Sequence, residues 1–116
     1  MEVVQIVDLK RAALTEYTEA HANVPVEEQL KEVGLGKIRV HFWEGSNESS
    51  PIRLVMSGVW NATSVQETFE DAMARYMTLP GVKEWEEWMD TLKVPLPGAT
   101  KPNWQRCSLI YGTPGS

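Results

Sequence analysis

The spacing of hydrophobic residues changes several times along the chain, and each spacing predicts one element of secondary structure. Residues Val3 to Val7 form a β-branched run that is typical of a strand. From Leu9 onward the apolar residues recur at spacings of three and four, which predicts an amphipathic helix that ends before Pro25. A second helical segment, Val26 to Val33, begins with acidic residues and stops at Gly34. The first third of the chain is therefore predicted to be one strand followed by two helices.

The middle of the chain alternates between apolar and polar residues, which predicts a β-hairpin. The segment Lys37 to Glu44 has an apolar side, with Ile38, Val40 and Phe42, and a polar side, with Lys37, Arg39, His41 and Trp43. Gly45 to Pro51 is a loop by composition, and Ile52 to Trp60 is the second strand. Gly58 within that strand indicates a bulge or a close approach of two backbones.

Two helices are predicted after the hairpin. Ser64 or Thr63 can cap the first, with Glu67 as a capping-box partner, and this helix runs to about Tyr76. The second starts at Pro80 and extends to Leu92. Its apolar stripe consists of Val82, Trp85, Trp88, Met89 and Leu92. Its acidic residues are interpreted as a solvated face and are Glu84, Glu86, Glu87 and Asp90.

The C-terminal part is predicted to be a linker, a strand and a tail. The linker, Val94 to Pro102, holds three prolines and a glycine. Gln105 to Tyr111 is the last strand, in which Cys107 is expected to be buried and inert. Gly112 to Ser116 is expected to be a frayed tail.

The order of these elements predicts an α+β fold of the ferredoxin-like type, βαββαβ, as a single domain over residues 1–116. Such a fold has one four-stranded antiparallel sheet with helices on one face. The uncovered face would carry Arg39, His41 and Trp43. Because a sheet face with large aromatic residues is rarely left bare, we expect it to form a ligand pocket or the interface of a homodimer.

Composition and charge exclude several kinds of partner. The net charge is −5 and the pI is about 5.0, which argues against nucleic acid and against anionic membrane surfaces. One cysteine allows neither an internal disulfide nor a cysteine-based zinc site. The sequence also shows no leader peptide and no apolar run of about 20 residues, so a cytoplasmic protein is expected.

The candidate chemistry centres on Tyr17 and His21. In a helix, residues four apart lie on one face, so the phenol and the imidazole would project to the same side. Histidine can both donate and accept a proton near neutral pH, which suits an acid–base role. The alternative is a histidine that only stabilises the end of a helix. His21 and His41 are not spaced as a metal pair, so no metal site is predicted.

Several of these motifs together resemble the L-rhamnose mutarotase family of dimeric α/β-barrel proteins, over roughly Val3 to Tyr111. The matching motifs are Tyr17-x-x-x-His21, the segment Pro25 with Glu28 to Leu30, the strand Lys37 to Trp43, and Trp85-Glu-Glu-Trp88-Met89. The resemblance implies a cofactor-free isomerase that interconverts the α and β anomers of a monosaccharide such as L-rhamnose through the open-chain aldehyde. It implies that His21 is the acid–base group, that Tyr17 assists it, and that Trp85 and Trp88 line the sugar site.

The chain departs from the family pattern at three places. Val24 stands where the family has a tryptophan, Glu86 separates Trp85 from the next tryptophan, and the hairpin loop is longer. Two alternatives therefore stay open. One is a cyclase or cofactor-free oxygenase that acts on a polyketide-like or aromatic intermediate, for which Trp43, Met56 and Trp60 would suit a flat apolar ligand. The other is a dimeric binding or stress-response module in which His21 has no chemical role.

Overall fold

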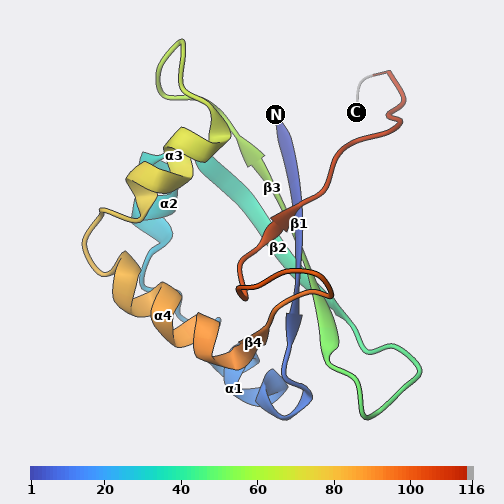
Figure 1. The fold of residues 1–116 in the computed structure, drawn as a ribbon. Helices are drawn as coiled ribbons and strands as arrows, with labels where there is room; N and C mark the ends of the chain where they lie inside the picture. Colours follow the sequence, from blue (N-terminus) through green and yellow to red (C-terminus); the bar gives the residue numbers. More distant parts are fainter. Residues whose placement is uncertain (115–116) are drawn as a thin grey trace.

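A curled antiparallel sheet with all its helices on one face forms the structure (Figure 1). The computed structural model describes residues 1–114; Gly115 and Ser116, the end of the predicted tail, lie outside the described residues. The strands are β1 (Glu2–Leu9), β2 (Leu35–Trp43), β3 (Ile52–Trp60), β4 (Lys93–Val94) and β5 (Gln105–Arg106). The helices are the 3₁₀ turn η1 (Arg11–Ala13), α1 (Leu14–Ala20), α2 (Glu27–Glu32), α3 (Phe69–Tyr76) and α4 (Val82–Leu92). This arrangement confirms the predicted α+β, ferredoxin-like fold.

Strand β1 is the centre of the sheet. The strand order is β2-β3-β1-β4, and β1 pairs with β3 along its whole length, from Glu2 opposite Val59 to Leu9 opposite Ile52. The strand continues past Val7, where the predicted strand ended, because the Asp8 carboxylate accepts a hydrogen bond from Arg53 Nε at 2.9 Å on the neighbouring strand. As a result, α1 begins only at Leu14, five residues later than expected.

The fourth strand differs from the prediction. Two short strands, β4 and β5, occupy the free edge of β1, and the proline-containing segment between them leaves the sheet. Proline has no N–H to donate, so this segment cannot continue the ladder. The predicted strand over Gln105 to Tyr111 is wrong beyond Arg106. The Cys107 N–H still donates to the Val4 carbonyl at 2.8 Å, but the Cys107 side chain is exposed, so its predicted burial is also wrong.

A β-bulge curls the hairpin toward the helices. The register of β2 and β3 shifts between Gly36 and Arg39, and Lys37 has a positive φ of 51°. Gly58 lies opposite this bulge, where a Cβ atom would be 3.3 Å from the Gly36 carbonyl oxygen. The close backbone approach expected at Gly58 is therefore confirmed. Bulges bend and twist a strand, which makes the helix-facing side of this sheet concave.

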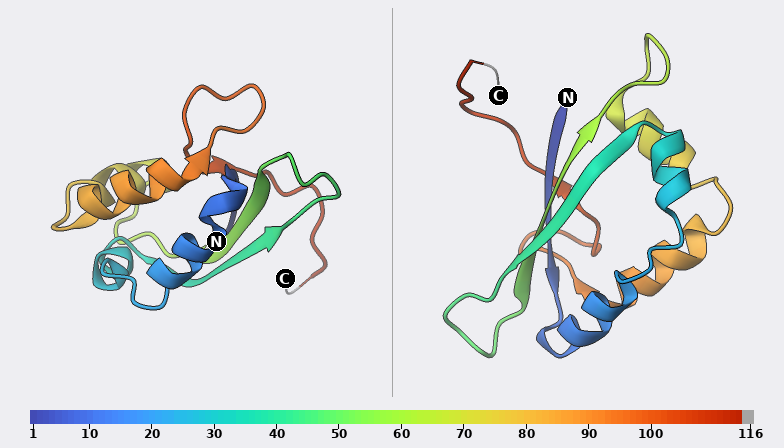
Figure 2. Two further views of the ribbon diagram at one scale, coloured as in Figure 1. Left: turned by 90° about the horizontal axis from the view of Figure 1, so that it is seen from below. Right: turned by 180° about the vertical axis from the view of Figure 1, so that it is seen from behind.

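The hydrophobic core lies between the helices and this concave side (Figure 2). β1 contributes Val7 and Leu9, and β3 contributes Ile52 and Leu54, all nearly inaccessible to solvent. From the helices come Phe69, Ala72, Val82 and Met89. Trp60 and Val33 also belong to this core, and the Trp60 indole N–H donates to the Val33 carbonyl at 3.0 Å.

The cap of α3 lies at Thr68 and not at Thr63 or Ser64. The Thr68 hydroxyl accepts from the Asp71 N–H at 3.1 Å, and the Asp71 carboxylate accepts from the Thr68 N–H at 3.2 Å. Thr68→Ala should therefore lower the free energy of unfolding by about 1 kcal/mol. Ser64→Ala is the matched control, because the Ser64 side chain caps no helix. Urea denaturation of both variants checks the assignment, and an equal loss in the two variants would contradict it.

Candidate active site

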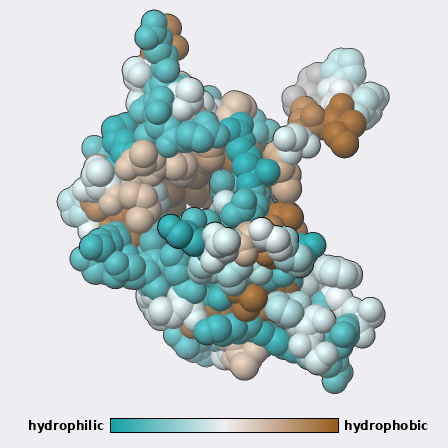
Figure 3. All heavy atoms as spheres, in the orientation of Figure 1, coloured by the Kyte–Doolittle hydropathy of each residue, from teal (hydrophilic) through white to brown (hydrophobic). Residues whose placement is uncertain are grey.

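A cavity of about 460 Å³ lies between the concave side of the sheet and the helices (Figure 3). Its walls come from β1, β2 and β3 on one side and from α1 to α4 on the other. The sequence predicted instead that the uncovered face of the sheet would close the site. That expectation is wrong for this cavity, because it is enclosed by the helix-covered face of one chain. The volume of the cavity falls within the range of roughly 300–1,000 Å³ that is typical of small-molecule sites.

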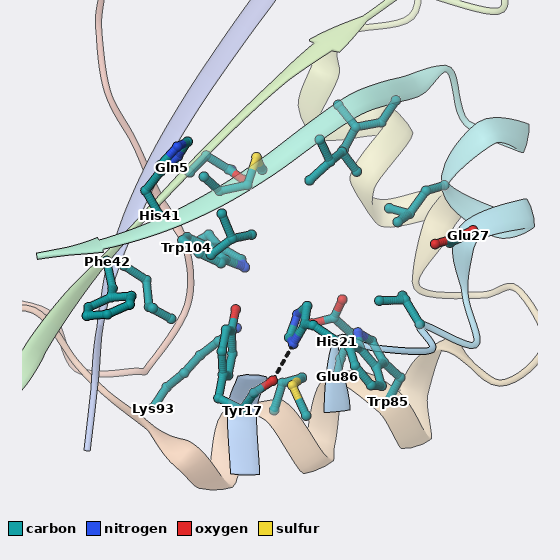
Figure 4. A pocket seen from close by; sticks show the side chains of 18 of the residues that line it. Gln5, Tyr17, His21, Glu27, His41, Phe42, Trp85, Glu86, Lys93 and Trp104 are labelled. Carbon is teal, nitrogen blue, oxygen red and sulfur yellow. Dashed lines mark hydrogen bonds between the residues drawn. The ribbon is translucent and has the colours of Figure 1, made fainter. Parts of the chain in front are cut away.

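Tyr17 and His21 line this cavity together (Figure 4). Their ring centroids are 4.2 Å apart, and the planes are tilted by 32°. Trp85 of α4 contacts the other side of the imidazole edge-on, with centroids 5.2 Å apart. The helical spacing of four residues therefore brings the phenol and the imidazole into one site, as the sequence predicted.

The position of His21 at the C-terminal cap of α1 fixes its tautomer. Imidazole Nδ1 lies 2.7 Å from the Tyr17 carbonyl oxygen. Because a carbonyl oxygen only accepts hydrogen bonds, Nδ1 must carry a hydrogen and donate it. In the neutral ring, Nε2 is then the nitrogen with a free lone pair, and it can accept a proton.

Glu86, which was predicted to lie on a solvated helix face, also lines the cavity. Glu86 is half-buried on α4, and its Oε1 accepts a hydrogen bond from the Tyr76 hydroxyl of α3 at 2.9 Å. Burial raises the pKa of Glu86 above its ordinary value, although the nearby Lys93 ammonium and the Tyr76 hydroxyl partly oppose this effect. Glu86 can therefore hold a proton more readily than an exposed glutamate does.

The two tyrosines of the cavity keep their protons. Burial, reinforced by the charge of Glu86, raises the pKa of Tyr17 far above its ordinary value. Burial also raises the pKa of Tyr76, with Glu86 as a further cause. At neutral pH both phenols are hydrogen-bonding groups, and neither can serve as a base.

Of the three residues predicted to bind substrate from the polar side of β2, two do not line this cavity. His41 lines the cavity, together with Val40 and Phe42 from the apolar side. Arg39 and Trp43 are exposed and are not among the described residues that line it, and Trp43 has 65% of its surface accessible. Their predicted roles in substrate binding thus have no support from this cavity.

The two tryptophans of α4 lie in different places. Trp85 is buried and lines the cavity. Trp88 is half-exposed, and its indole N–H donates to Glu16 Oε2 at 2.8 Å on the surface. Residues three apart on a helix differ by about 60° in direction, which is enough to place Trp85 inside and Trp88 outside.

Several further polar or aromatic residues that line the cavity were not predicted as site residues. They are Gln5, Thr18, Glu27, Phe42, Tyr76, Glu86, Lys93 and Trp104. One sequence signal could have identified Glu86, because it follows Val82 by four residues and precedes Met89 by three, and so borders the apolar stripe of α4.

Within residues 1–114, no three His, Cys, Asp or Glu side chains converge as a metal site requires. Among the helices of the same residues, none has both the length and the apolarity needed to cross a bilayer.

Comparisons with known proteins identify a family and a similar fold. The model of the family described as L-rhamnose mutarotase matches residues 2–113. An L-rhamnose mutarotase from Formosa agariphila has a similar solved structure, with a TM-score of 0.67 over 97% of this chain and 98% of that chain. The two sequences are 14% identical, so this likeness concerns the fold. No curated protein matched the chain.

Proposed function

We propose that His21 and Glu86 are the acid–base pair of a sugar mutarotase. The chain belongs to the L-rhamnose mutarotase family and is therefore an isomerase that interconverts the anomers of a sugar. The observation that carries the proposal is the 2.7 Å contact between His21 Nδ1 and the Tyr17 carbonyl, which leaves Nε2 free to accept a proton in a cavity that also holds a carboxyl group. His21 and Tyr17 were predicted as the catalytic residues, and Glu86 is added to them.

Mutarotation needs two proton transfers. A base removes the proton of the anomeric hydroxyl, an acid protonates the ring oxygen, and the bond between the anomeric carbon and the ring oxygen breaks to give the open-chain aldehyde. Rotation about the adjacent C–C bond and ring closure, with the two proton transfers reversed, give the other anomer. Neutral His21 accepts the first proton at Nε2. Glu86 donates the second from Oε2, because Oε1 is held by the Tyr76 hydroxyl.

The environments of the two groups suit these opposite roles. A catalytic pair works when its surroundings favour a proton on one member and its absence on the other. Burial favours the protonated form of Glu86, and the Tyr17 carbonyl holds the His21 ring in the tautomer that exposes a lone pair. Tyr17, whose phenol stays protonated, is a hydrogen-bonding contact for a sugar hydroxyl.

The apolar walls suit the ring of a monosaccharide. Trp85 and Trp104 both line the cavity, and indole faces can stack on the C–H faces of a sugar. We include Trp85 among the substrate-binding residues. His41 borders the cavity, but it pairs with Val55 of β3, whose side chain lies on the uncovered side of the sheet, so its role in binding remains a prediction. Binding by Arg39, Trp43 and Trp88 remains a prediction that this cavity does not support. None of the comparisons favours the cyclase or oxygenase alternative.

A homodimer through the uncovered face of the sheet remains part of the proposal. This face carries Trp43, and the partly covered residues Val4, Ile6 and Val55 lie on the same side of β1 and β3. Leu109, Ile110 and Tyr111 are also exposed on the C-terminal segment, which extends away from the sheet (Figure 3). A second copy would cover these apolar residues. Sedimentation equilibrium measures the state of assembly, and a monomer at micromolar concentration would contradict the proposed homodimer.

A cytoplasmic location also remains a prediction.

Exchange NMR tests the function. The resonances of the two anomers of L-rhamnose, and of a panel of hexoses, are saturated in turn, and transfer between them is measured with and without protein. The proposal predicts faster exchange than in buffer for at least one monosaccharide. Exchange equal to that in buffer for the whole panel would contradict it.

A further inference from the structure

Two of the three buried polar or charged residues among those described face the cavity without a hydrogen-bonding partner. The three are Gln5, Asp8 and Lys93. Asp8 is paired with Arg53 outside the cavity. By contrast, the side chains of Gln5 and Lys93 line the cavity, and neither makes a hydrogen bond within residues 1–114. Among the described residues, no side-chain nitrogen or oxygen atom is both fully buried and unpaired, so the polar ends of Gln5 and Lys93 are open to the cavity. Two polar groups that face one cavity with no partner in the protein are available to bind a ligand.

Lys93 is the more unusual of the two. Its side chain is only 2% accessible, and the nearest carboxylate oxygen with which it pairs is Asp90 Oδ1 at 3.9 Å. Its Nζ lies 4.8 Å from the centroid of the Trp104 ring, which stabilises a cation but accepts no conventional hydrogen bond. Burying an ammonium group with so little compensation is unfavourable. Burial accordingly lowers the pKa of Lys93, while Glu86 and Asp90 oppose this shift.

We propose that Lys93 and Gln5, beside Trp104, bind an anionic oxygen group of the sugar, so that this mutarotase prefers sugars with a carboxylate or a phosphate to neutral ones. The inference rests on the function proposed above and specifies its class of substrate. An anion bound at Lys93 would supply both the acceptor and the charge that the buried ammonium lacks. A neutral hydroxyl would supply only the acceptor.

The carboxyl group of Glu86 does not occupy this position. Figure 4 shows Lys93, Gln5 and Trp104 on one side of the cavity, and Glu86, His21 and Trp85 on the other. Glu86 Oε1 is engaged by Tyr76, and Glu86 and Lys93 form no ion pair within 4.0 Å. The reacting end of a sugar could therefore lie at His21 and Glu86 while its anionic end lies at Lys93.

The test compares sugars that differ only at C6. Exchange NMR measures the apparent KM and the maximal rate for D-glucose, D-glucuronate and D-glucose 6-phosphate, for the corresponding galactose and mannose series, and for L-rhamnose. For at least one series we expect the wild type to have an apparent KM about tenfold or more lower for the anionic sugar than for the matched neutral one. A preference for the uronate or for the phosphate identifies which anionic group is bound.

The variant Lys93→Met should abolish this preference, so that the apparent KM values for the anionic sugar and the matched neutral sugar agree within about twofold. Because it removes a poorly compensated buried charge, Lys93→Met should fold at least as stably as the wild type. Lys93→Gln is a second variant that keeps a donor but not the charge, and it should show the same loss of preference.

The outcomes separate the two proposals. No exchange above buffer with any sugar, L-rhamnose included, would overturn the proposed function itself. Exchange with neutral sugars only, or an equal preference in the wild type and both Lys93 variants, would overturn the anion-binding proposal and leave the mutarotase function intact.

Discussion

Replacing His21 with glutamine is expected to slow catalysed anomer exchange by about 10²–10⁴-fold, which is the usual contribution of a positioned acid–base group. Glutamine can still hydrogen-bond to the Tyr17 carbonyl through its amide, but it cannot exchange a proton near neutral pH. The fold should persist, because His21 lies at the end of α1 and outside the hydrophobic core. Exchange NMR on the best sugar of the panel measures the effect.

The matched control is Glu19→Gln, which changes an exposed side chain two residues away on the same helix. Its exchange rate should equal that of the wild type. Melting curves of both variants show whether a loss of activity reflects unfolding. If His21→Gln is folded and fully active, His21 is not the base.

Replacing Glu86 with glutamine should have the second-largest effect, a loss of about 10²-fold or more in the maximal rate. The amide oxygen can still accept the hydrogen bond of the Tyr76 hydroxyl, so the shape of the cavity is kept, and only the transferable proton is removed. Glu87→Gln is the control, because Glu87 is exposed and pairs only loosely with Lys83 at 3.9 Å. Equal rates for Glu86→Gln and wild type would exclude Glu86 from the chemistry.

The same substitution should change how stability depends on pH. Because burial raises the pKa of Glu86, the folded protein binds more protons than the unfolded chain between the ordinary and the raised pKa. The contribution of this group to the free energy of unfolding therefore falls as the pH rises through that window. The charges of Lys93 and His21, together with the Tyr76 hydroxyl, oppose the shift and Asp90 adds to it, but the net direction is upward.

The glutamine of Glu86→Gln cannot ionise. The free energy of unfolding of this variant, relative to that of the wild type, should therefore increase as the pH is raised from 4 to 7. Urea denaturation at both pH values measures the difference. A difference in stability that is the same at pH 4 and pH 7 would show that Glu86 has no raised pKa in the folded protein.

The spacing of apolar residues predicted most of the helices and strands, because each element must turn its apolar residues toward the hydrophobic core. The stripe of α4 and the alternation of β3 follow directly from burial against one side. The end of β1 and the last strand were mispredicted because partners far away in the chain decide them. Arg53 allows Asp8 to remain in a strand, and β1 offers the C-terminal segment only a short pairing edge.

The candidate site was only partly predictable for a similar reason. A spacing of four residues is local, so Tyr17 and His21 could be paired from sequence. Whether Glu86 and Lys93 face solvent or a cavity depends on the curl of the sheet that faces them, and the bulge opposite Gly58 sets that curl. The side of the sheet that carries the site could not be chosen from alternation alone, because alternation gives two faces without saying which is covered.

The central claim is that the sugar binds between the helices and the sheet, and the five indole N–H resonances of the protein test it most directly. A ¹⁵N-labelled sample is titrated with the sugar that exchanges fastest. We predict that the resonances of Trp85 and Trp104, which line the cavity, shift with the sugar concentration while that of the exposed Trp43 does not. A shift of Trp43 with Trp85 and Trp104 unchanged would place the site on the uncovered face of the sheet and contradict the account.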